Sequence, residues 1–176
     1  MNNLINLTKE QDNSQTCNEQ HQEHSQYVVY TDGACANNHL QNLGSRKAGW
    51  AAITLINGQL VGEQSGSLKG EDATSNRAEL IAAIRGLSGV PEGAYIELFT
   101  DSKYVIQCIT EWLGNWKKNG WRTANKKPVK NMDLIQELDE LYQNRCVHMT
   151  WVKGHSGNEL NERADSLAKQ TMMINT

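Results

Sequence analysis

Apolar residues recur along this chain with two different periods, which predict a mixture of strands and helices. Apolar runs or period-two alternation predict five strands, at residues 27–31, 48–56, 60–68, 94–100 and 146–152. Apolar residues three or four apart predict four helices, at residues 74–87, 102–113, 131–143 and 159–172. Three strands come first, followed by a helix, a strand, two helices, a strand and a final helix. This order predicts an α/β fold in which helices pack on a five-stranded mixed sheet.

The first 26 residues lack this patterning. They are rich in Asn, Gln, Glu and His, and they carry a formal charge of −3, which equals that of the whole chain of 176 residues. Such a segment cannot bury enough apolar surface to offset the entropy cost of ordering it. We therefore expect a disordered polar tail over 1–26 and a single domain over 27–176.

Composition favours a cytoplasmic protein. The first residues have neither a basic start nor an apolar middle, so we expect no secretory signal. No apolar run approaches the ~20 residues that span a bilayer. The four cysteines are scattered and form no C-x-x-C pair, so we expect four reduced thiols rather than a zinc site or a disulfide scaffold. We expect a monomer that does not contact a membrane.

Two of the predicted strands end at a threonine that is followed directly by an aspartate. Asp32 follows the first strand and Asp101 follows the fourth. A lone Asp-Gly after a strand is more often a turn in which the side chain bonds its own backbone. The carboxyl edge of an α/β sheet, however, is also where ligand sites form. A rigid sheet that presents two carboxylates at this edge could hold a metal ion.

Two further acids lie beside the buried stripes of predicted helices. Glu79 precedes Leu80, and Asp165 follows Ala164. A single acid on a helix is more often solvated, but four acids from four elements around one sheet edge indicate a cation site. A set of oxygen ligands alone suits Mg²⁺ or Mn²⁺. Two such ions about 4 Å apart can activate a water and stabilise the leaving oxygen of a phosphodiester.

One histidine is placed to assist such chemistry. His155 lies ten positions before Asp165, in a loop flanked by Gly154 and Gly157. Histidine titrates near neutrality and can shuttle a proton or help a product depart. A loop histidine that only forms a hydrogen bond is an equally good interpretation of its position alone.

Residues 117–130 form a basic segment. Its basic residues, with no acid among them, are Lys117, Lys118, Arg122, Lys126, Lys127 and Lys130. Trp112 and Trp116 precede the segment and Trp121 lies within it. Tryptophan either packs in a core or stacks on sugars and bases. A solvated loop is one interpretation of the charges. In a chain with a metal-dependent nuclease site, contact with a phosphate backbone explains them better.

The blocks YTDGAC, SNRAELIAAI, FTDSKYV, NWKKNGWRTANKKPVKN and WVKGHSGNELNERAD resemble, in order, the signatures of the bacterial type 1 ribonuclease H family. The resemblance runs from about residue 27 to about 168. It implies a ribonuclease H-like fold and endonucleolytic hydrolysis of the RNA strand of RNA–DNA hybrids by two Mg²⁺ ions, which Mn²⁺ could replace. The products would carry 5′-phosphate and 3′-hydroxyl ends.

The resemblance also implies roles for individual residues. Asp32 would bridge both ions, Asp165 would bind the ion that activates water, and Glu79 and Asp101 would bind the other. The residues expected to contact the hybrid, besides the six basic residues, are Asn38, Thr74, Ser75, Asn76, Lys103, Asn115, Trp116 and Trp121. Relatives often carry arginine at the position of Asp72.

Two other classes of function remain open at this point. A ribonuclease H-like nuclease with another substrate, such as an integrase or an exonuclease, shares the acids but not the GHSGNELNERAD block together with the basic segment. A non-catalytic hybrid-binding protein would lack at least one carboxylate, and none is missing here.

Overall fold

The computed structural model describes residues 26–36 and 46–174. Asn38 and nearly all of the predicted tail lie outside these ranges. Five strands form one sheet: β1 (Tyr27–Cys35), β2 (Lys47–Ile56), β3 (Gln59–Lys69), β4 (Tyr95–Thr100) and β5 (Cys146–Trp151). Their order across the sheet is β3-β2-β1-β4-β5. The first three strands are antiparallel, and β4 runs parallel to both β1 and β5, which confirms the predicted mixed sheet.

The turn between β2 and β3 has the geometry that Asn-Gly predicts. Asn57 has a φ of 49° and Gly58 a φ of 79°. Two residues with positive φ form a tight hairpin turn whose twist matches that of the strands. The side chain of Asn57 also accepts a hydrogen bond from the backbone N–H of Gln26, 3.0 Å away, so the turn is tied to the start of β1.

The helices match the predicted ranges with one difference. They are α2 (Ser75–Ser88), α3 (Lys103–Gln107), α4 (Leu113–Lys118), α5 (Met132–Gln143) and α6 (Glu159–Ile174). The predicted helix over 102–113 is a longer, three-part helix, because a π-helical turn (Cys108–Trp112) joins α3 to α4. The hydroxyl of Thr110 donates to the carbonyl of Ile106 within this stretch, at 2.9 Å. Hydrogen bonds from Ser or Thr side chains to the backbone carbonyl four residues earlier often accompany irregular or bent helical turns.

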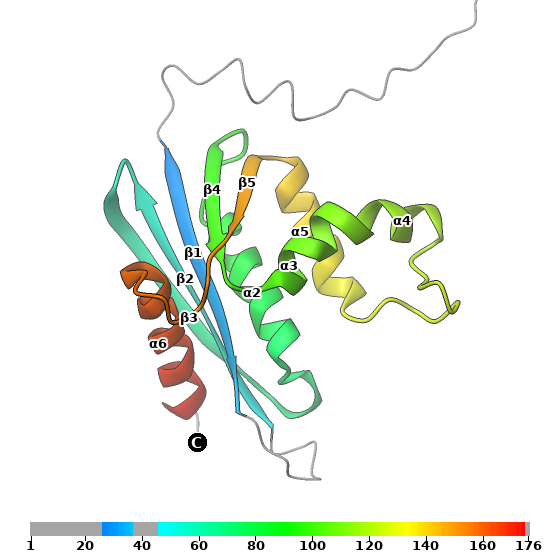
Figure 1. Ribbon diagram of the computed structural model, residues 1–176, viewed down its shortest axis with the longest axis horizontal. Helices are drawn as coiled ribbons and strands as arrows, with labels where there is room; N and C mark the ends of the chain where they lie inside the picture. Colours follow the sequence, from blue (N-terminus) through cyan, green and yellow to red (C-terminus); the bar gives the residue numbers. More distant parts are fainter. Residues whose placement is uncertain (1–25, 37–45, 175–176) are drawn as a thin grey trace, which may run out of the picture.

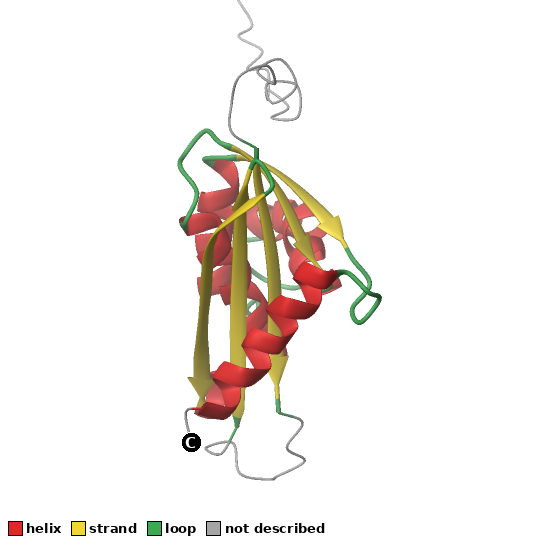
Figure 2. Cartoon of the chain, turned by 90° about the vertical axis from the view of Figure 1, so that its left-hand side faces the viewer, coloured by secondary structure: helices red, strands yellow, loops and turns green. Residues whose placement is uncertain are grey.

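The sheet is covered differently on its two faces (Figures 1 and 2). Helix α6 alone crosses one face, over β1, β2 and β3, and the other helices lie behind the opposite face. The main apolar core is on that opposite face, where Val29, Leu80 and Leu98 are fully buried. On the α6 face the fully packed residues of the cluster are small, with Ala34 and Ala51 against Ala168, and Leu167 and Met172 pack against them partly buried.

Two glycines let helix backbones approach the sheet closely. A Cβ on Gly33 of β1 would lie 2.5 Å from the backbone nitrogen of Glu79 in α2. A Cβ on Gly49 of β2 would collide with the carbonyl oxygen of Ala168 in α6. Only glycine permits such contacts. The contact at Gly33 places α2, which carries Glu79, directly against the strand that carries Asp32, and the contact at Gly49 places α6, which carries Asp165, against the neighbouring strand β2.

One of the cysteines differs from the sequence prediction. Cys35 and Cys108 are free. Cys146 is disulfide-bonded, so the expectation of four reduced cysteines is wrong for Cys146. In the described part of the chain, no helix has both the length and the apolar character needed to cross a bilayer.

Candidate active site

Asp32 lies inside a strand rather than at its end. The predicted end of the first strand at residue 31 is wrong, because β1 continues to Cys35 and pairs Asp32 with Ala51 of β2. The parallel pairing of β1 with β4 does end there, and its last pair is Thr31 with Thr100. Asp32 and Asp101 are therefore the first residues beyond the point where β1 and β4 separate. The repeated Thr-Asp dipeptide marks this fork in the sheet.

Three carboxylates meet at the fork. One oxygen each from Asp32, Glu79 and Asp101 lies within 4.8 Å of the other two. Asp32 is 5% exposed and Glu79 is 8% exposed. The Oε2 atom of Glu79 is buried and has no hydrogen-bond partner among the described residues. Because an unpartnered buried carboxylate oxygen is costly, this group of three is suited to bind a cation.

The proximity of these acids raises their pKa values. Burial, followed by the charges of Asp101 and Asp165, raises the pKa of Asp32 to about 7. Burial and the charge of Asp32 raise the pKa of Glu79 well above its usual value. The pKa of Asp101 is raised by burial and by Asp165. The backbone N–H of Gly33 donates to Asp32 and Glu79 and offsets part of this cost. Such shifts indicate a cluster suited to bind positive charge.

Asp165 lies next to the cluster but outside the group of three. Its charge contributes to the raised pKa of both Asp32 and Asp101. Its Oδ2 atom is 2.6 Å from the ammonium of Lys169, one turn further along α6. The same oxygen is 3.8 Å from Nδ1 of His155. The structure thus brings all four predicted acids and the predicted histidine to one place.

His155 is held at the rim by a tight loop. It has a φ of 53° and an exposed side chain. Gly154, immediately before it, lies against Asp101: a Cβ there would be 2.5 Å from Oδ2 of Asp101. The loop can therefore pass this close to the carboxylate only because residue 154 has no side chain.

Sequence reasoning missed Asn161. Its side chain is 1% exposed and hydrogen-bonds to the carboxylate of Asp101, which lowers the pKa of that acid and offsets part of the rise. Asn161 precedes Asp165 by four residues, so both lie on the same face of α6. That spacing is the signal in the sequence that could have identified it.

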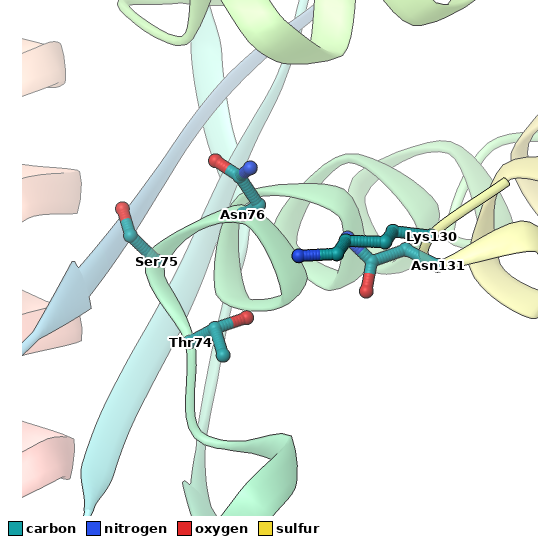
Figure 3. Close-up of a pocket in the computed structure, with 5 residues that line it drawn as sticks. All are labelled: Thr74, Ser75, Asn76, Lys130 and Asn131. Atoms are coloured by element: carbon teal, nitrogen blue, oxygen red, sulfur yellow. The ribbon is translucent and has the colours of Figure 1, made fainter. Parts of the chain in front are cut away.

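A pocket of about 330 Å³ lies at the start of α2, lined by Thr74, Ser75, Asn76, Lys130 and Asn131. Lys130 directs its amine towards the start of α2, and the hydroxyl of Thr74 points into the same space, whereas Ser75 points away (Figure 3). Asn131 is a lining residue that was not predicted. Next to the pocket, the guanidinium of Arg77 in α2 forms an ion pair with the carboxylate of Asp133 in α5, at 2.9 Å. The same guanidinium also pairs with Asp72, at 3.3 Å.

The basic segment projects from the body as the end of α4 and the loop that follows it (Figure 1). Asn115, Lys118, Lys126 and Lys127 are exposed there. The ammonium of Lys117 instead lies 2.5 Å from Asp139, which is 7% exposed, so this lysine has a structural partner. The exposed Arg122 donates to the carbonyl of Lys126 and supports the loop.

The tryptophans of the segment pack against the protein. Trp112 and Trp116 lie 5.6 Å apart between ring centres, and Trp116 and Trp121 are partly buried against the main core. Lys103 lies elsewhere, at the first position of α3, with its ammonium 5.0 Å from the centre of the Trp151 ring.

Comparisons with known proteins identify the family of the chain. The RNase H family model matches residues 24–173. The chain is 48% identical over 149 residues to the ribonuclease H of Nitrobacter hamburgensis, covering 84% of this chain and 91% of that protein. It is 47% identical over 148 residues to the ribonuclease HI of Pseudomonas aeruginosa PAO1, covering 82% of this chain and 92% of that protein.

A solved structure shows the same fold. The crystal structure of LC9-RNase H1, a type 1 RNase H with the type 2 active-site motif, matches with a TM-score of 0.74 at 25% identity. The match covers 88% of this chain and 75% of that one. With the five-stranded sheet, the acidic cluster and a family match over most of its length, this chain belongs to the ribonuclease H family.

Proposed function

We propose that this protein hydrolyses the RNA strand of RNA–DNA hybrids at the fork between β1 and β4, with two Mg²⁺ ions, leaving 5′-phosphate and 3′-hydroxyl ends. The observation that carries the proposal is the buried group of Asp32, Glu79 and Asp101, whose carboxylate oxygens lie within 4.8 Å of one another. Family membership supports the choice of substrate.

The residues at the fork fit divalent cations. They offer carboxylate oxygens alone, which is the ligand set that Mg²⁺ prefers and Mn²⁺ accepts. We assign Asp32 to both ions, Glu79 and Asp101 to one, and Asp165 to the other. The unpartnered Oε2 of Glu79 and the raised pKa values of three of these acids support cation binding here, and the division of the acids between the two ions follows the family resemblance.

The chain's own residues position the reaction around that centre. When bound, the two ions activate a water and stabilise the leaving oxygen of a phosphodiester. The backbone of Asp32 is fixed by the β1–β2 pairing. Because Gly154 has no side chain, the carboxylate of Asp101 has room beside it. The imidazole of His155, exposed beside Asp165, can take a proton from the site and pass it to solvent.

The hybrid would contact two further surfaces. The pocket at the start of α2 offers the hydroxyl of Thr74, the amides of Asn76 and Asn131, and the ammonium of Lys130, a set that suits a backbone phosphate. The exposed lysines of the basic segment provide sequence-independent attraction to phosphates. Asn38 and Asn115 remain proposed contacts, and Asn38 lies outside the described residues.

All four acids come from one chain, so the proposed enzyme works as a monomer. Sedimentation velocity under the conditions of the cleavage assay measures the oligomeric state directly. A dimer that is required for activity would contradict it.

The test of the function compares three labelled substrates with and without Mg²⁺: an RNA–DNA hybrid, an RNA duplex and single-stranded RNA. We expect cleavage of the hybrid alone, dependent on Mg²⁺. Asp32→Asn should reduce the rate by about a thousandfold or more, because it removes a ligand shared by both ions. Thermal unfolding of this variant checks that it folds. Tight hybrid binding without cleavage would instead support a non-catalytic binding protein.

A further inference from the structure

The turn that carries Asp101 lies beyond the end of the strand pairing. Thr100 and Trp151 form the last pair of β4 and β5. The backbone N–H of Val152 still donates to the carbonyl of Thr100, at 3.0 Å. From Asp101 onward the β4–β5 ladder supplies no donor, although every backbone carbonyl needs one or must face water.

Trp151 supplies that donor from its side chain. Its indole Nε1–H donates to the backbone carbonyl of Asp101, with a distance of 3.0 Å between nitrogen and oxygen. The turn is further closed at its other end, where Ser102 donates from its backbone to the hydroxyl of Thr100 and caps α3. The indole thus extends the sheet's hydrogen bonding by one residue, to the residue whose carboxylate enters the acidic cluster.

Lys103 lies over the face of the Trp151 indole ring. Its ammonium lies 5.0 Å from the centre of the Trp151 ring, which is 45% exposed. A cation over an indole face is attracted to it, so the ring has a preferred orientation even at this open edge. Lys103 follows Asp101 by two residues, and the contact therefore closes the same short turn.

We infer that Trp151 is a positioning residue for the metal-binding carboxylate of Asp101, acting through the hydrogen bond from its indole N–H to the Asp101 carbonyl. Groups that orient a metal ligand typically contribute 10- to 100-fold to metal affinity or activity. The inference rests on the proposed function, since it takes Asp101 to be a metal ligand.

The decisive variant is Trp151→Phe, which keeps a ring beneath Lys103 and removes the donor. We expect kcat to fall about tenfold and the half-saturating Mg²⁺ concentration to rise about tenfold, with the KM for the hybrid unchanged. The Mg²⁺ midpoint is also measured without substrate, from the dependence of Tm on Mg²⁺, and should shift in the same direction. Trp151→Tyr, which places no donor at the indole N–H position, should behave alike.

Trp50→Phe is the matched control. Trp50 also lies on a strand beneath a cation, with the guanidinium of Arg85 6.0 Å from its ring centre, and it packs against Gly66. This variant should keep the parent's Mg²⁺ midpoint.

Two outcomes would overturn the inference. One is a folded Trp151→Phe protein with the parent's kcat and Mg²⁺ midpoint. The other is a rise in KM alone, which would make the ring a surface for the nucleic acid. Asp101→Asn, assayed beside it, separates this inference from the proposed function: an active Asp101→Asn enzyme removes the metal assignment itself.

Discussion

Gly154 and Asp101 lie so close together that no further atom fits between them. A Cβ at residue 154 would be 2.5 Å from Oδ2 of Asp101. The carboxylate is also hydrogen-bonded by Asn161, so a displacement away from residue 154 would disturb this contact as well. At the scale of single residues, the site therefore depends on an absent side chain as well as on the acids.

Gly154→Ala should reduce kcat by about a hundredfold, because displacing a catalytic group by about 1 Å has effects of that size. The Tm should change little, since the loop is only partly buried. Gly62→Ala in β3 is the control, because its Cβ would meet nothing within 4 Å. Equal activity of the two variants would show that Asp101 tolerates displacement.

His155→Ala should be milder than Asp32→Asn, because a proton shuttle contributes ~10²-fold and water can partly replace it. Its exposed side chain has no packing role, so the Tm should stay unchanged. Single-turnover rates on a hybrid measure the difference. A loss as large as that of Asp32→Asn would mean that His155 does more than carry a proton.

The basic segment can be tested as an element, separately from the acids. Lys118→Ala, Lys126→Ala and Lys127→Ala together should raise KM with little effect on kcat. They should also reduce the slope of log affinity against log salt by roughly two to three, at about 0.9 per lost phosphate contact. A parent-like KM and salt slope would remove these lysines from the substrate surface.

Lys117→Ala is the matched comparison. Its ammonium pairs with the buried carboxylate of Asp139, so removing it leaves an uncompensated acid inside the protein. We expect a lower Tm and little change in the salt slope.

The elements themselves were largely predictable, and the exceptions have physical causes. Among the described residues, period-two and helical spacing located the five strands and the helices α2, α3, α5 and α6, but not α4 or the short 3-10 helix Gly70–Asp72, and Asn57-Gly58 specified its turn. The end of β1 was misplaced because Gly33 was taken as a turn signal, whereas it allows α2 to approach. The π-helical turn before α4 leaves no signature in apolar spacing, because Ile109 and Leu113 are four apart in either case.

At the scale of the whole molecule, the four acids of the site come close together only once the chain has folded. The four were predictable as a set because each follows or flanks an apolar stretch at one sheet edge. Their distances were not, since these depend on β1–β4 pairing that stops at Thr31 and on helix approach at Gly33. The pairing of Lys117 with Asp139, far apart in sequence, was equally beyond sequence reasoning.

The metal-free protein should lose stability as pH rises. Folding raises the pKa of Asp32 from 3.8 to about 7, so the folded state holds a proton that the unfolded chain releases. This contribution is complete below about pH 4 and is lost by about pH 7. In EDTA, Tm should therefore fall across this range. Asp32→Asn should reduce the slope and raise stability at pH 8 by on the order of 1–3 kcal/mol.

Added Mg²⁺ should reverse the loss above pH 7, since a cation favours the ionised carboxylates. Differential scanning calorimetry at several pH values measures both effects. A metal-free Tm that is flat or rises between pH 5 and pH 8, with Asp32→Asn no more stable than the parent, would contradict the buried acidic cluster.

Gly33 and Gly49 have a consequence for how this sequence can change over time. At both positions the main chain of a helix rests on the main chain of a strand, α2 at Gly33 and α6 at Gly49. The separation of helix and sheet is therefore independent of the sizes of the apolar side chains around it. Mutational drift can exchange one aliphatic residue for another in the core while the spacing of Glu79 and Asp165 from Asp32 is preserved. One added methyl at either glycine would displace a helix together with its acid.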